Sequence, residues 1–221
     1  MKIKWLGHSA FLITSASGFR VITDPYQSGA FNGGLGYRPI TDKADIYTVS
    51  HLHADHYDPK IIAAGATVLK SPGKTETKGV AVEGILTCHD DTGGRQRGLN
   101  TVFCLTLDGM RVCHLGDLGH ILSAKELKSI GGVDVLMIPV GGYFTIDPVK
   151  ATKIAEALNP KVILPMHFKT TAAEESSFPI AGVEEFLKGK KHIRKLDQSE
   201  VEITKETLPQ ETEVWVLKHA N

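Results

Sequence analysis

Short runs in which apolar and polar residues alternate dominate the first third of the chain and predict β-strands. These runs cover residues 2–6, 10–14 and 19–23, and the turn-forming segment Ser15-Ala16-Ser17-Gly18 separates the last two. Together they predict an antiparallel meander that opens a sheet. Residues 26–39 then contain four glycines among aromatic and basic residues, which indicates a mobile surface loop.

Beyond residue 45 the pattern changes to strands that alternate with helices. Asp108-Gly109 is a strong hairpin signal between two strand-like runs. Helix starts are indicated near residues 58, 123, 147 and 183, and the last three helices end near 130, 158 and 187. The remaining predicted strands cover residues 45–49, 67–70, 80–86, 101–107, 111–115, 133–139, 161–164 and 214–217. Two sheets flanked by helices accommodate this order.

Composition is that of an ordinary globular protein. The chain has 221 residues, of which 42% are hydrophobic and 23% charged, so it is long enough for one large domain with its own core. We therefore expect a single domain over residues 1–221. Lys plus Arg and Asp plus Glu both total 25, so there is no net positive field to hold a polyanion and nucleic acid is not expected as a partner.

The cysteines and the N-terminus favour a cytoplasmic protein. Cys88, Cys104 and Cys113 are odd in number and widely spaced, which argues against a disulfide framework and for reduced thiols. The chain enters a strand pattern directly from Met1, without the apolar region of a signal peptide. No stretch reaches the length of a transmembrane helix, so neither membrane insertion nor membrane binding is expected.

Four metal-competent side chains lie within six residues: His51, His53, Asp55 and His56 follow the predicted strand 45–49. Residues two apart on an extended segment point the same way, so His51 and His53 can reach one ion. The following turn can redirect Asp55 and His56 to a second ion. The alternative is a solvated polar turn whose histidines cap backbone groups, but that alternative does not require such a concentration of donors.

Remote ligands are also needed, because a catalytic zinc ion usually takes three protein ligands and keeps a position for water. His89, Asp117 and His167 each come just after a predicted strand, where functional residues gather. Asp90 and Asp91 lie beside His89 and compete with it as ligands, or they cap the loop that follows. His114, His120, His192 and His219 have no cluster around them and are expected to be structural.

With these residues in place, the sequence resembles the metallo-beta-lactamase superfamily, and within it small metal-dependent hydrolases similar to ascorbate-6-phosphate lactonase. The resemblance runs from Leu6-Gly7-His8-Ser9 to Pro165-Met166-His167 and includes Thr23-Asp24-Pro25, the histidine run, His89 and Gly116-Asp117. It implies an α/β fold, a four-layer αββα sandwich. It also implies a first ion held by His51, His53 and His89, a second held by Asp55, His56 and His167, and Asp117 bridging both.

The function expected from this site is hydrolysis by a hydroxide that two divalent ions hold, with Asp117 bridging and Asp55 helping to position the water. Zinc is the first choice, and manganese, iron or nickel are alternatives. The bond cleaved is an ester, lactone, phosphodiester or amide bond in a small molecule. His8 and Asp24 are expected to orient ligands rather than to bind metal, the alternative being an ordinary polar pair at strand ends. The absence of a signal peptide argues against antibiotic hydrolysis.

Two features near the predicted site concern the substrate. Arg95 and Arg97 follow His89 in a glycine-rich loop, and they either clamp an anionic substrate by bidentate hydrogen bonds or are solvated loop charges. Tyr37, Arg38 and the turn over residues 141–144 either form walls or a lid, or pack as ordinary turns.

Two other functions compete with hydrolysis. One is a non-catalytic metal-binding or regulatory protein of the same fold. The other is a redox di-iron protein, which is expected to carry a carboxylate in place of the second histidine of the run, where this chain has His53.

Overall fold

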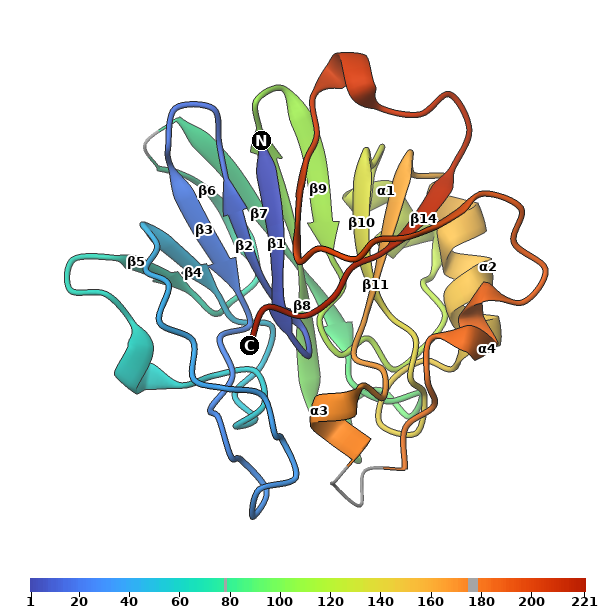
Figure 1. Ribbon diagram of the computed structural model, residues 1–221, viewed down its shortest axis with the longest axis horizontal. Coiled ribbons are helices and arrows are strands. Elements are labelled where there is room, and N and C mark those ends of the chain that lie inside the picture. The colour runs from blue at the N-terminus through green and yellow to red at the C-terminus, as the bar shows by residue number, and fades with distance from the viewer. Residues whose placement is uncertain (78, 175–178) are drawn as a thin grey trace.

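Two β-sheets packed face to face form the centre of the protein in a computed structural model that describes residues 1–77, 79–174 and 179–221 (Figure 1). The strands of the first sheet are β1 (Lys2–Gly7), β2 (Ala10–Thr14), β3 (Arg20–Thr23), β4 (Ile46–Thr48), β5 (Thr67–Leu69) and β13 (Glu200–Glu202). Their order is β13-β1-β2-β3-β4-β5. β1, β2 and β3 form the predicted antiparallel meander, and β3, β4 and β5 pair in parallel.

The second sheet has eight strands within the described residues. In their order across the sheet they are β12 (Ile193–Lys195), β14 (Glu213–Val216), β11 (Val162–Met166), β10 (Val135–Pro139), β9 (Met110–His114), β8 (Leu99–Leu107), β7 (Val80–Cys88) and β6 (Gly73–Thr77). β6 to β9 pair antiparallel, whereas the strands from β9 to β12 in this order pair in parallel. Asp108-Gly109 makes the predicted hairpin between β8 and β9, with φ of 49° and 71°.

The helices are short and lie outside the sheets. They are α1 (Ala124–Ile130), α2 (Pro148–Leu158), α3 (Thr171–Glu174), α4 (Glu184–Leu187) and the 3₁₀ turns η1 (Pro59–Ile61) and η2 (Lys205–Thr207). α1 begins with the predicted capping box of Ser123 and Glu126, and Asp147 caps α2. Figure 1 shows α2 and α4 together on the outer side of the second sheet. Within the described residues, no helix has the length and hydropathy needed to cross a membrane.

Side chains of the first sheet alternate between two apolar clusters, as the period of a strand requires. On β2, Phe11 and Ile13 share the cluster between the sheets with Val112 and Met137 of the second sheet, whereas Leu12 belongs to the outer cluster. Burial of this surface is the main source of stability. The α/β sandwich with two central sheets is confirmed.

The outer face of the first sheet is covered mainly by chain without regular secondary structure. Residues 26–39, predicted to be a mobile surface loop, contribute buried side chains to this layer, including Tyr26, Leu35 and Tyr37. Their aromatic rings and apolar groups take the place that a helix holds on the opposite side. The glycine content of the segment did not reveal this packing.

Three strands were not predicted from the sequence: β6, β12 and β13. They are five, three and three residues long, and all of β12 and most of β6 and β13 are exposed. An exposed strand needs no apolar alternation, because pairing of its backbone with a neighbour is enough to form it. β6 and β12 are the two edges of the second sheet and β13 is an edge of the first.

Six strands end at one edge of the sandwich, toward the bottom of Figure 1, and each is followed by polar residues. The residues that follow are His8 after β1, Asp24 after β3, His51 to His56 after β4, His89 after β7, Asp117 after β9 and His167 after β11. The topology therefore places residues far apart in the sequence at a common edge.

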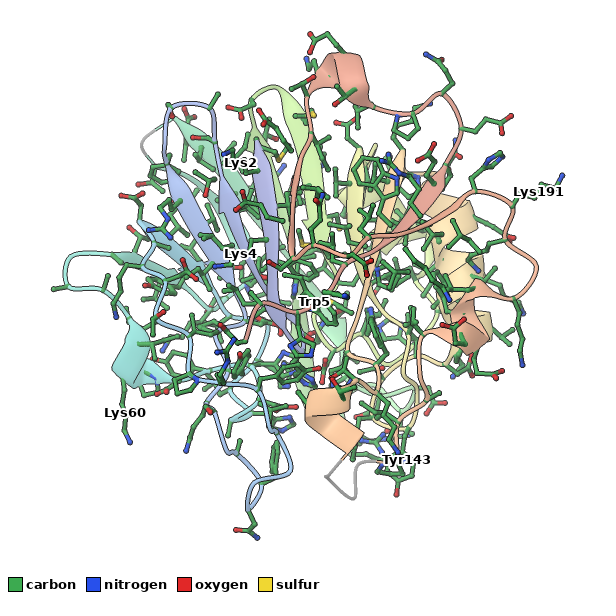
Figure 2. All side chains as sticks on the ribbon, viewed as in Figure 1. Lys2, Lys4, Trp5, Lys60, Tyr143 and Lys191 are labelled. Carbon is green, nitrogen blue, oxygen red and sulfur yellow. The ribbon has the colours of Figure 1, made fainter. Side chains whose placement is uncertain are left out.

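Trp5, near the centre of Figure 2, connects this edge to the core. Its indole Nε1 donates a hydrogen bond to the carbonyl of His8 at 3.0 Å, and the backbone N–H of His167 donates to the same carbonyl at 3.2 Å. One acceptor thus joins the ends of β1 and β11, which belong to different sheets.

We expect Trp5→Phe to lower the free energy of unfolding by about 1–3 kcal/mol, because it leaves a buried carbonyl with one donor fewer and reduces core volume. Urea denaturation measures the change. Trp215→Phe is the matched control, since the Trp215 indole donates to the partly exposed carboxylate of Glu213. An equal or larger loss in the control contradicts the role given to Trp5.

Candidate metal centre

The histidine run after β4 supplies one part of a buried polar cluster. His51 Nε2 and His53 Nδ1 lie 3.0 Å apart, and His89 from the end of β7 joins them. One ligand atom from each of these three imidazoles lies within 4.8 Å of the others. Three imidazoles at this separation are a donor set that suits zinc and related ions.

A second group lies beside the first. It consists of Asp55, His56, His167 and His8, whose ligand atoms also lie within 4.8 Å of one another. A mixed set of carboxylate and imidazole donors suits a wider range of divalent ions than imidazoles alone. The structure therefore brings together the residues that the resemblance grouped around a second ion, and adds His8 to them.

Asp117 lies between the two groups. Its Oδ2 is 3.2 Å from His89 Nε2 and 3.4 Å from His167 Nε2, and its Oδ1 is 3.1 Å from His56 Nε2. The side chain is almost completely buried. One carboxylate thus faces imidazoles of both groups, which is the position that a bridging ligand requires.

Asp117 is held in place by a residue that the sequence did not single out. Asn100 Oδ1 accepts a hydrogen bond from the Asp117 backbone N–H at 2.9 Å, while Asn100 Nδ2 donates to the carbonyl of Leu115 at 2.9 Å. Gly116 has a φ of +56°, and a Cβ there would lie 2.4 Å from Asn100 Oδ1 and from Ser50 Cβ. The Gly116-Asp117 pair therefore needs glycine for close approach as well as for conformation.

Asp24 orients the histidine run from the side opposite to Asp117. Its Oδ2 lies 2.7 Å from His56 Nδ1, so the Nε2 of the same ring faces Asp117. Ser50 donates to Asp24 through its backbone N–H and its hydroxyl, and the hydroxyl is also 3.0 Å from His51 Nδ1. Such contacts set the tautomer and direction of a metal ligand. Ser50 was missed because a serine next to a histidine has no distinctive spacing.

His8 has two roles open to it. Its Nε2 is 3.1 Å from Asp55 Oδ2, which fits the predicted orienting role. Its ring also lies 4.1 Å from that of His167, measured between centroids, which places it among the potential ligands of the second group.

Three residues of the cluster have strained backbones. His8, Asp24 and His167 have φ of 50°, 40° and 50°, a left-handed conformation that costs a residue other than glycine about 1–3 kcal/mol. Each comes directly after a strand. Strain of this kind gathers at functional sites, where the surrounding structure enforces it.

Electrostatics prepare the cluster for cations. Burial lowers the pKa of His51 to about 3, and burial together with the charge of His167 lowers that of His8 to about 4, so both rings are neutral donors at neutral pH. Burial raises the pKa of Asp117, but His167 and His56 outweigh it and hold that pKa well below its ordinary value. Burial opposes protonation of His56, yet Asp117 and Asp55 raise its pKa well above the ordinary value.

Several buried polar atoms of the cluster have no hydrogen-bond partner within the described part of the chain. They are Asp55 Oδ1, Asp117 Oδ1, His56 Nε2, His89 Nδ1 and both ring nitrogens of His167. An unsatisfied buried polar atom lowers the stability of the fold by about 1–3 kcal/mol. A concentration of such atoms in one place therefore requires an explanation. Divalent ions would satisfy those that face the interior of the cluster, and the donor set fits such ions.

The remaining aspartates and histidines that the sequence offered as possible ligands lie outside the metal centre. Asp90 accepts five hydrogen bonds from residues 92–97, so it caps the loop. Asp91 is exposed and lies 3.7 Å from Lys150. His114 is an interior residue whose Nε2 lies 2.8 Å from the carbonyl of Ser9. The histidines at 120, 192 and 219 likewise lie outside the groups of potential ligands found among the described residues.

A pocket of about 380 Å³ opens onto the cluster. Its lining residues are Phe31, His53, Asp55, His89, Arg97, Asp117 and Phe144. The two arginines of the glycine-rich loop therefore differ: Arg97 lines the pocket, whereas Arg95 is exposed and lies outside the lining.

Tyr37 and Arg38 do not form a lid. Tyr37 is buried and its hydroxyl lies 2.8 Å from Thr170 Oγ1. Arg38 donates to the carbonyl of Ala220.

The turn over residues 141–144 contributes one wall. Tyr143, labelled at the lower edge of Figure 2, is 64% exposed, whereas its neighbour Phe144 lines the pocket. The prediction of an aromatic wall from this turn is confirmed for Phe144 only.

Comparison with known proteins identifies the family. The model of the beta-lactamase superfamily domain matches residues 2–167. A UPF0173 metal-dependent hydrolase of Carboxydothermus hydrogenoformans is 33% identical over 199 residues, which covers 77% of this chain and 85% of that protein. A crystal structure from Thermotoga maritima, described as a candidate zinc-dependent hydrolase of the metallo-beta-lactamase superfamily, is 33% identical with a TM-score of 0.79. The match covers 98% of this chain and 97% of that one.

The fold also occurs with other chemistry. The diiron beta-hydroxylase CmlA of Streptomyces venezuelae shares it at 12% identity, with a TM-score of 0.51 over 75% of this chain and 44% of that chain. Identity this low shows a common fold alone, so function rests on the residues of the site and on the closer relatives. On that evidence the chain belongs to the beta-lactamase superfamily and is a metal-dependent hydrolase.

Proposed function

We propose that the protein cleaves an ester, lactone, phosphodiester or amide bond in a small molecule by hydrolysis at a binuclear metal centre. The observation that carries the proposal is the position of Asp117, a buried carboxylate that faces imidazoles of two separate donor groups. A single ion would leave one of these donor groups without a cation, whereas two ions would be bound by one group each. The narrower resemblance to ascorbate-6-phosphate lactonase remains a prediction.

The proposed first ion is held by His51, His53 and His89, and the second by Asp55, His56 and His167. Asp117 serves both. Zinc is the proposed metal because imidazoles dominate the donor set, with manganese, iron or nickel as alternatives. The division follows two of the groups of donors whose ligand atoms lie within 4.8 Å of one another, and a further such group, His51, His56 and Asp117, connects them.

When bound, two divalent ions would supply hydroxide at neutral pH and polarise the bond under attack. The chain's own residues then position the reactants. Asp55 Oδ2 is held by His8 Nε2 at 3.1 Å, while Asp55 Oδ1 has no hydrogen-bond partner among the residues that the structure describes. Asp55 Oδ1 is therefore free to accept a hydrogen bond from the attacking water and to orient it. The substrate enters through the pocket that Phe31 and Phe144 line.

Asp117→Asn tests the catalytic proposal. The variant keeps the size of the side chain but removes the negative charge shared by both donor groups, so we expect metal-dependent hydrolysis to fall by at least about 100-fold. The measurement is turnover of zinc-loaded protein on aryl esters, a lactone, bis(4-nitrophenyl) phosphate and an aryl amide.

Asp91→Asn is the matched control, since Asp91 is exposed and outside the cluster; its turnover is expected to equal that of the wild type. Hydrolysis that survives in Asp117→Asn contradicts the central role of this carboxylate. A fully loaded wild type that turns over none of these bonds favours a non-catalytic metal-binding role instead.

Asp24→Asn tests the support behind the ligands. The change weakens the contact that directs His56 toward Asp117, so we expect zinc affinity to fall by about 10- to 100-fold. Competition with a chromogenic chelator measures it. Asp58→Asn, at the exposed cap of η1, is expected to leave zinc affinity unchanged. Equal affinities for all three proteins would show that Asp24 has only a structural role.

A further inference from the structure

The pocket wall outside the metal cluster has a simple composition. Of the described residues that line it, four belong to the cluster, and the other three are Phe31, Arg97 and Phe144. Two phenyl rings and one guanidinium therefore face whatever occupies the pocket. A ligand that fits them has an apolar body and an anionic group.

Arg97 is available for such a group. It is partly buried, and in the described parts of the chain no carboxylate forms an ion pair with its guanidinium. Its Cζ lies 5.8 Å from the centroid of the Phe144 ring, a cation–π distance that keeps the guanidinium beside this wall. An unpaired guanidinium at a pocket wall is a bidentate site for carboxylate or phosphate oxygens.

Asp90 fixes the loop that carries Arg97. Its Oδ1 accepts from Thr92 N, Thr92 Oγ1 and Gly94 N at 2.6–2.9 Å, and its Oδ2 accepts from Gln96 N at 3.0 Å and Arg97 N at 2.8 Å. A carboxylate with this many donors holds its loop strongly. Because the donors include the Arg97 backbone itself, the base of the arginine is fixed.

The same loop is fastened to the metal cluster. The His89 backbone N–H donates to the carbonyl of Gly98 at 3.0 Å, and Gly98 N–H donates to Gly94 at 3.1 Å. Gly119, two residues after Asp117, lies so close to this loop that a Cβ would be 2.3 Å from Asp90 N and His89 C. Backbone contacts therefore set the distance between the Arg97 backbone and His89 of the proposed metal centre.

From these contacts we propose that the natural substrate is an anion with a flat apolar body, that Arg97 receives its anionic group, and that Asp90 positions Arg97 for this purpose. The inference rests on the proposed function for the reaction itself and adds the class of substrate. Phe31 and Phe144 contact the apolar body, and the bond to be cleaved lies toward Asp55 and Asp117. Arg95, in the same loop but outside the pocket, takes no part.

The test compares binding of 2-naphthoate, a planar monoanion, with that of 2-naphthamide, its neutral counterpart, to zinc-loaded protein by isothermal titration calorimetry. We expect the wild type to prefer naphthoate. Arg97→Gln is expected to raise the Kd of naphthoate by about 10- to 100-fold and to leave naphthamide within about two-fold, because a charge-assisted hydrogen-bond pair is lost. Arg95→Gln is the matched control and is expected to match the wild type for both ligands.

Asp90→Asn separates positioning from folding. We expect it to weaken naphthoate and not naphthamide, at a zinc content equal to that of the wild type, since a general loss of structure weakens both ligands alike. Phe144→Ala is expected to weaken both ligands, because both share the apolar body.

Two results overturn the inference. One is a wild type that binds naphthoate no more tightly than naphthamide. The other is an Arg97→Gln variant with unchanged naphthoate affinity, which shows that the carboxylate binds the metal ions instead. Because these are binding measurements, they stand apart from turnover on the ester, lactone, phosphodiester and amide panel, whose failure counts against the proposed function and not against this substrate class.

Discussion

The buried carboxylate of Asp117 is the constraint around which the rest of the site is arranged. A carboxylate is costly to bury unless cations or donors surround it, and here the imidazoles of His56, His89 and His167 approach within 3.1–3.4 Å. Those residues follow β4, β7 and β11, which belong to different sheets. Satisfying one buried charge therefore requires both sheets to present their strand ends at the same edge.

The sandwich provides this edge and also stores strain there. His8, Asp24 and His167 are left-handed residues directly after strands, and their conformation is held by contacts such as the Trp5 indole on the His8 carbonyl. The core between the sheets thus offsets the cost of a polar, strained cluster at its rim. In the same way, the loop from Asp90 to Gly98 joins the cluster to the wall of the substrate pocket through hydrogen bonds rather than through a mobile lid.

Much of the site could be predicted from the sequence, because metal donors are rare residue types and their positions after strands are visible in the apolar pattern. His51, His89, Asp117 and His167 lie together as expected. Ser50 and Asn100 could not be found this way, since their roles depend on single hydrogen bonds across the fold. The left-handed φ angles were also invisible, because nothing in a residue type other than glycine marks them.

The fold was predictable where the apolar pattern is strong and not where pairing alone forms the structure. The buried strands and the caps of α1 and α2 match the pattern. The exposed edge strands β6, β12 and β13 carry no such pattern, and the buried layer over residues 26–39 was concealed by its glycines. The family resemblance supplied the order of layers that the pattern left open.

The most direct test of the binuclear centre is metal content by elemental analysis after zinc loading and removal of free metal. The wild type is expected to hold about two ions per chain, and His51→Ala and His167→Ala about one each, because each variant removes a ligand from a different donor group. His192→Ala, on the exposed surface beside Glu211, is expected to keep both. A wild type that retains no zinc, or variants that both retain two ions, would contradict the account.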